Sequence, residues 1–156
     1  MNETPTLTTG TATPQRPSLG LVLRQAHMRA ARIFTEELRP LDLDNSRAAI
    51  LIHVGLLGLL TQRQLVESMG VDKSAMVRSL DALEARGLVR REPHPTDRRA
   101  HVVVVTEEGQ EMVGRVAEAV DRTEARTTAC FTPEERELFH SLALRFACAP
   151  DEAPSA

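Results

Sequence analysis

The chain has 156 residues, of which 42% are hydrophobic and 26% are charged, and its formal net charge is -3 at pH 7. This length suffices for one compact domain and is short for two. The acidic total excludes a uniformly basic nucleic-acid binder, but residues 61–106 carry eight basic and six acidic side chains, whereas residues 107–156 carry five basic and eleven acidic ones. An anionic partner is therefore expected to bind the middle of the chain.

Cysteine usage and hydropathy predict a cytoplasmic protein with no membrane partner. Cys130 and Cys148 are too few for a disulfide framework and have no metal-ligand spacing. The longest apolar stretch, residues 48–60, contains His53 and two glycines and is too short to span a bilayer. The N-terminus has no signal pattern of basic and then apolar residues.

The first third of the chain predicts a tail and two helices. Residues 1–17 are rich in threonine and proline, which indicates a disordered tail. From Ser18, the expected N-cap, apolar residues recur every three or four positions until Pro40 ends an amphipathic helix. Ser46 is the expected cap of a second helix that runs through Leu57. This helix is apolar on nearly every side, which is typical of a buried core helix.

The next stretch predicts two short helices joined by a glycine turn. Thr61 and Gln64 fit a capping box, in which the Thr61 hydroxyl accepts from the backbone NH of residue 64 and the Gln64 side chain reaches back. Gly70 makes the turn, and Asp72 caps a second helix that ends at Gly87. The inward residues of that helix are Met76, Leu80 and Leu83. This arrangement is typical of a helix-turn-helix.

After these helices the hydrophobic period changes to that of strands. Residues 88–91 and 100–105 are short runs rich in β-branched residues, separated by a loop over 92–99 whose prolines do not fit a central strand. They predict a β-hairpin with a long basic tip. Helices beginning at Thr106 and Thr132 follow, each with acidic residues in its first turn. The predicted fold is mainly α with a small β-hairpin wing.

Several of these motifs occur together in one known family. They are Arg78 and residues 60–65, 70–74, 83–91, 95–100 and 104–109. Over about residues 19–147 the chain resembles the MarR (multiple antibiotic resistance regulator) family of winged helix-turn-helix transcription regulators. The resemblance implies a homodimer whose N- and C-terminal helices form the dimerisation domain, and a small effector that alters DNA affinity.

The resemblance also implies a domain organisation. We expect a single domain over 18–147, with a DNA-binding lobe at about 46–106 and dimerisation helices at about 18–40 and 107–147. A second disordered tail is expected at 148–156.

The helix after Asp72 is the expected reader of duplex DNA. Arg78 can donate two hydrogen bonds to one guanine, whereas Lys73 and Ser74 are expected to contact phosphates. Relatives usually have hydroxyl residues where this helix has Ala75 and Val77, so methyl contacts with thymine are expected to contribute more. The expected DNA-binding residues are Thr61, Gln62, Lys73, Ser74, Ala75, Arg78, Arg91, Arg98 and Arg99.

Two roles remain open for the arginines of the wing tip. One of Arg98 and Arg99 can enter a narrow minor groove, while the other pairs with an acidic side chain and holds the wing. The spacing does not assign them, and the family pattern favours Arg99 as the DNA contact. The alternative for the whole tip is a loop of solvated charges.

The effector pocket implied by the resemblance lies between the first, second and fifth helices. Its candidate polar residues are Arg24, His27, Arg47 and His53, which would attract a small anionic or aromatic molecule. The alternative is that they are surface or dimer-interface groups. The five histidines show no paired ligand spacing, and no metal or cofactor is predicted. Thiol sensors of the family use a cysteine in the first helix, which this chain lacks.

Two other classes of function are alternatives to a DNA-binding regulator. A winged-helix module that binds protein rather than DNA is the main alternative, and the basic side chains clustered on the predicted helix and wing oppose it. An enzyme has no support, because the sequence contains no phosphate-binding glycine loop, nucleophile elbow or paired metal ligands. The expected partners are therefore a pseudo-palindromic duplex, a second copy of the chain and a small effector.

Overall fold

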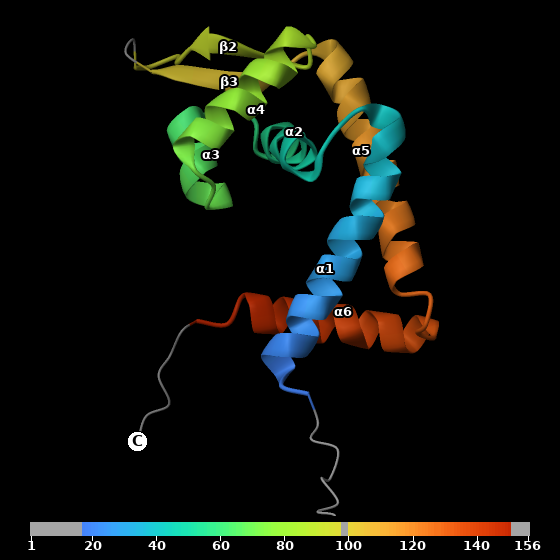
Figure 1. The fold of residues 1–156 in the computed structure, drawn as a ribbon. Helices are drawn as coiled ribbons and strands as arrows, with labels where there is room; N and C mark the ends of the chain where they lie inside the picture. Colours follow the sequence, from blue (N-terminus) through green and yellow to red (C-terminus); the bar gives the residue numbers. More distant parts are fainter. Residues whose placement is uncertain (1–16, 98–99, 151–156) are drawn as a thin grey trace, which may run out of the picture.

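The computed structural model describes residues 17–97 and 100–150. In these ranges the chain forms six α-helices, a short 3₁₀ helix and a small three-stranded sheet, which confirms the expected fold class. The predicted tails, 1–17 and 148–156, lie for the most part outside the described residues, and the domain boundaries stay predictions. In Figure 1 the sheet, α3 and α4 gather at one end, and α1 and α5 run side by side away from it towards α6.

The helices have the following bounds: α1 Leu19–Leu38, η1 Arg39–Leu41, α2 Asn45–Leu57, α3 Gln62–Met69, α4 Lys73–Ala85, α5 Glu107–Thr127 and α6 Pro133–Ala147. The predicted starts of five helices are confirmed, because in each case the expected first side chain accepts a hydrogen bond from the first turn of its helix. They are Ser18, Thr61, Asp72, Thr106 and Thr132.

The predicted cap of α2 is wrong. Asp44, and not Ser46, precedes the helix, and its carboxylate accepts from the backbone NH of Arg47 at 2.8 Å. The helix is a core element, with Ala48, Ile50 and Leu51 fully buried. Its C-terminal end, however, is exposed.

The sheet contains one strand more than the sequence predicted. Strands β2 (Val89–Pro93) and β3 (His101–Val105) form the expected hairpin, and β1 (Leu60–Thr61) pairs with the other side of β3. The hairpin loop is also shorter than predicted, because Pro93 belongs to β2 and lies opposite His101. Proline is accepted there because β2 is an edge strand, so no ladder partner requires the missing NH on its outer side.

One hydrophobic core joins these elements. It contains the inward residues of α4, together with side chains from α1, α2, α3, the sheet and α5. Met76, Leu80 and Leu83 are each about 1% exposed or less, as the spacing predicted. Burial of this stripe fixes which face of α4 remains in contact with water.

Candidate nucleic-acid interface

Helix α4 lies on α3 with its N-terminal end held by one aspartate. The Asp72 carboxylate accepts from the backbone NH groups of Ser74 at 2.8 Å and Ala75 at 3.1 Å, and from the Ser74 hydroxyl. The Ser74 hydroxyl bond, followed by the two backbone bonds, holds the pKa of Asp72 below its usual range. Ser74, expected to bind a phosphate, therefore already donates its hydroxyl proton within the cap.

The water-facing side of α4 presents two cations. Lys73, Ser74 and Arg78 are exposed, whereas Ala75 is half-buried. Within residues 17–97 and 100–150, neither Lys73 nor Arg78 makes a hydrogen bond or an ion pair through its side chain, although the Arg78 charge acts on Asp72. Both cations are thus available to an anionic partner.

A concavity of about 350 Å³ separates the N-terminal ends of α3 and α4 and is lined by Gln62, Arg63, Val66 and Lys73. The predicted capping box beside it is confirmed. The Thr61 hydroxyl forms part of that box, since it accepts from the backbone NH of Gln64 at 3.2 Å. Arg63 pairs with Glu67 at 2.7 Å, and the hydrogen bond from this pair raises the pKa of Arg63.

The wing lies beside α4 and carries two arginines of different surroundings. Arg90 is exposed and pairs with Glu92 at 2.5 Å on its own strand. Arg91 points to α4, where it pairs with Asp81 at 2.6 Å and with Glu84. Partial burial acts to lower the pKa of Arg91, but the bond to Asp81 and the charge of Glu84 raise it overall. The two tip arginines, Arg98 and Arg99, lie outside the described residues.

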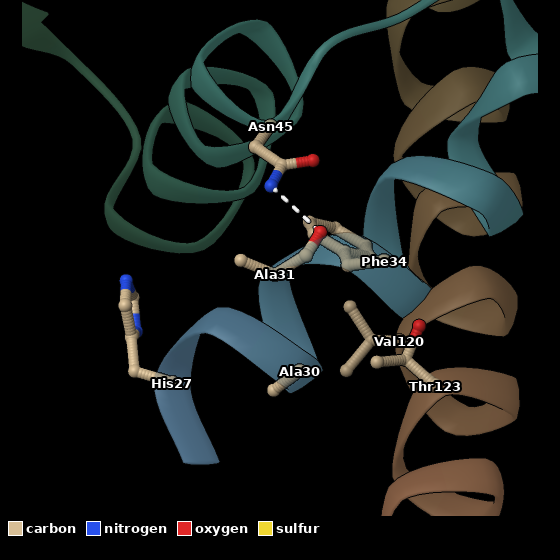
Figure 2. A pocket seen from close by; sticks show the side chains of 7 residues that line it. All are labelled: His27, Ala30, Ala31, Phe34, Asn45, Val120 and Thr123. Atoms are coloured by element: carbon tan, nitrogen blue, oxygen red, sulfur yellow. Dashed lines mark hydrogen bonds between the residues drawn. The ribbon is translucent and has the colours of Figure 1, made fainter. Parts of the chain in front are cut away.

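A second hollow lies where the resemblance implied an effector pocket. This pocket of about 340 Å³ has His27, Ala30, Ala31 and Phe34 from α1, Asn45 from α2, and Val120 and Thr123 from α5 around it. Figure 2 shows the Phe34 ring and Val120 on one side and His27 at the rim. The Asn45 amide donates to the Ala31 carbonyl at 3.2 Å, which joins α2 to α1 beside the pocket.

The four candidate effector residues do not come together. Of these, only His27 lines this pocket, and Arg47 lines a separate one of about 290 Å³ with Asp44. Arg24 is exposed on α1, and His53 is half-buried on α2. Sequence reasoning selected polar residues and so missed Phe34 and Val120. Only their places in the apolar stripes of two helices could have indicated them.

Two features of residues 17–97 and 100–150 bear on other functions. None of the helices there combines the length and hydropathy needed to cross a bilayer. Nor do three or more His, Cys, Asp or Glu side chains gather there as a metal site would require. Cys130 and Cys148 are free thiols on the surface.

Comparison with known proteins shows a likeness to one family. Residues 41–100, which include α2, α3, α4 and β2, match the model described as the MarR family. The crystal structure of wild-type MarR from E. coli superposes with a TM-score of 0.78 at 25% identity, over 87% of this chain and 100% of that one. The chain is therefore similar to the MarR family over residues 41–100, and over most of its length it has the fold of MarR from E. coli.

Two further solved structures record what similar proteins bind. A mutant MarR from E. coli in complex with operator DNA is 26% identical, with a TM-score of 0.73 over 85% of this chain and 94% of that one. BpsR from Bordetella bronchiseptica, whose DNA binding is regulated by 6-hydroxynicotinic acid, is 22% identical, with a TM-score of 0.76 over 88% of this chain and 100% of that one. At 22% identity, the likeness between this chain and BpsR is a likeness of fold.

Proposed function

We propose that this protein represses transcription by binding a pseudo-palindromic operator as a homodimer, and that a small effector releases it. The observation that carries the DNA-binding part is the pair of cations on α4, Lys73 and Arg78, which have no ion-pair partner among the described residues. An arginine presented by a rigid helix can read a guanine in the major groove, and a lysine near the helix N-terminus reaches phosphate. Arg98 and Arg99 are proposed to extend this contact to the minor groove.

The proposed dimer is supported by apolar surface that one chain leaves exposed. Leu138, Phe139 and Leu142 of α6 are about half exposed, and no residue of α6 is buried. The N-terminal half of α1 likewise exposes leucines. Such surface is rarely left in water, and a second copy would cover it with two-fold symmetry.

The proposed effector is a small aromatic acid that occupies the pocket of α1, α2 and α5. Phe34 and Val120 supply apolar contacts, while the His27 imidazole and the Asn45 amide can donate to an acidic group. The BpsR ligand, an aromatic acid, belongs to this chemical class. A pocket that touches both the long helices and the core helix of the DNA-binding lobe is suited to couple the two.

The deciding experiment is the selection of bound sites from a random duplex pool with the purified protein. We expect an enriched inverted repeat whose half-sites are about 10 bp apart. Failure to enrich any sequence would favour the module that binds protein. With the enriched duplex, benzoate serves as the simplest probe of the effector: it should lower DNA affinity in the wild type and do so less in His27→Ala.

A further inference from the structure

Two acidic residues lie on α4, the proposed recognition helix, close to where DNA is proposed to bind. Asp81 and Glu84 are three residues apart on α4, so they share one face of the helix. The Asp81 side chain is 57% exposed, and it follows Arg78 by less than one turn. An uncompensated carboxylate at this place would repel the phosphates of a duplex.

Arg91 of the wing strand β2 pairs with both carboxylates at once. One terminal nitrogen, Nη2, donates to Asp81 Oδ1 at 2.6 Å, and the other, Nη1, donates to Glu84 Oε2. The backbone NH of Arg91 also donates to Glu84 Oε1 at 3.1 Å. The planar guanidinium fixes the direction of these bonds, so the contact sets the position of the wing relative to α4 as well as the local charge.

The guanidinium is also less accessible than its neighbour on the strand. The Arg91 side chain is 28% exposed, against 58% for Arg90, which points to the other face of β2 and, among the described residues, pairs only with Glu92. A phosphate that bound the Arg91 guanidinium would have to displace two carboxylates, and both would lose their ion pair with it. The contacts therefore favour a role within the lobe over a role at the DNA.

We propose that Arg91 is a positioning residue that neutralises Asp81 and Glu84 and fixes the wing on the recognition helix, and that it does not contact DNA. This proposal rests on the proposed DNA binding. It replaces the expectation that Arg91 belongs to the contact set, and it assigns Asp81 and Glu84 a part in DNA recognition through Arg91.

The test compares DNA affinity over a range of salt concentrations for Arg91→Met, Asp81→Asn and the double variant, on the duplex that the wild type selects. A lost phosphate contact reduces the slope of log affinity against log salt by about 0.9. We expect Arg91→Met to bind on the order of tenfold more weakly with an unchanged slope. Asp81→Asn should recover most of this loss in the Arg91→Met background and change little in the wild type.

The outcome that overturns the proposal is equally definite. If Arg91 contacts a phosphate, the slope of log affinity against log salt falls by about one unit in Arg91→Met. Asp81→Asn then changes DNA affinity by the same factor in the wild type and in the Arg91→Met background. Arg90→Met is the matched control for loss of one positive charge from the same strand. If Arg91→Met fails to fold, the slope is measured on the double variant with Asp81→Asn instead. If the wild type selects no duplex, the proposed function itself has failed.

Discussion

Gly109 allows α5 to begin in contact with the turn that ends the recognition helix. A Cβ atom at this residue would lie 1.9 Å from the Leu88 carbonyl oxygen and 2.6 Å from Cγ1 of Val105. Thr106 holds the same junction, since its hydroxyl donates to the Gly87 carbonyl at 2.5 Å and accepts from the Gly109 NH at 2.9 Å. The approach of the long helix to the DNA-binding lobe is thus fixed at one residue.

Gly109→Ala is expected to lower the free energy of unfolding by about 1–3 kcal/mol, because the backbone of Leu88 cannot move aside at small cost. The matched control is Gly114→Ala on the same helix, where a Cβ would meet nothing within 4 Å. That change should stabilise by about 0.5–1 kcal/mol through helix propensity. Urea denaturation measures both, and equal effects would contradict the assignment of the close contact.

Arg78 is the residue on which the proposed sequence readout depends. Arg78→Ala should weaken binding to the selected duplex by about 1–3 kcal/mol and relax the preference at one base pair. Titration against the selected site and its single-base variants gives both quantities. Arg115→Ala, which removes an exposed arginine from α5, is the control and should leave affinity unchanged. An equal loss of affinity for every DNA sequence would show that Arg78 contacts a phosphate and reads no base.

At the scale of elements, α1 and α5 are joined by a network of ion pairs as well as by apolar contacts. Arg126 of α5 donates to Glu36 at 2.7 Å and to Glu37 at 2.6 Å, and Arg122 donates to Glu37 at 2.8 Å. Hydrogen bonds from Arg126 lower the pKa of Glu36, and those from Arg122 and Arg126 lower the pKa of Glu37. The network links the two long helices beyond the DNA-binding lobe.

This network predicts a pH dependence of stability. A carboxyl whose pKa is lowered by folding contributes stability above its ordinary pKa of about 4.3, and this contribution is lost as the pH falls through the lowered value. The free energy of unfolding should therefore decrease below about pH 5. Glu36→Gln with Glu37→Gln should flatten this decrease, whereas Glu111→Gln, at an exposed residue of α5, should not. If the double variant lost stability with falling pH as the wild type does, the ion-pair network would not be the cause of that loss.

At the scale of the whole molecule, the end far from the wing leaves the apolar residues of α6 uncovered in a single chain. In Figure 1, α6 lies across the end of the molecule opposite the sheet. Its only described aromatic contact is between Phe139 and Phe131 of the preceding turn, with ring centroids 5.2 Å apart. A chain with so much exposed apolar surface at one end, and with Lys73 and Arg78 exposed on α4 at the other, is suited to two-fold assembly on two half-sites.

Leu142→Glu should therefore weaken the dimer, because a carboxylate would enter an apolar interface. Sedimentation should show a dimer for the wild type at micromolar concentration and monomers for the variant. Its affinity for the full inverted repeat should fall towards that for a single half-site. Leu56→Glu, at a residue 77% exposed on α2, is the control. A wild-type protein that sediments as a monomer would exclude the proposed assembly.

The sequence by itself determined the elements whose signals are local. A cap joins a side chain to a backbone NH two or three residues later, so Thr61, Asp72 and Thr132 could be assigned without the fold. The stripe of α4 was also readable, because the helical period sets which residues share a face. These signals predicted the fold class, and they placed Lys73 and Arg78 on the exposed side.

Only the tertiary structure decided what depends on segments distant in the chain. Strand β1 exists because β3 offers it a partner, and the place of Pro93 in β2 depends on that strand being at the edge. Arg91 looked like a DNA contact in the sequence, because nothing local reveals that the strand turns it towards two carboxylates of α4. The pocket between three helices likewise depends on how they pack, since a cavity belongs to no single segment.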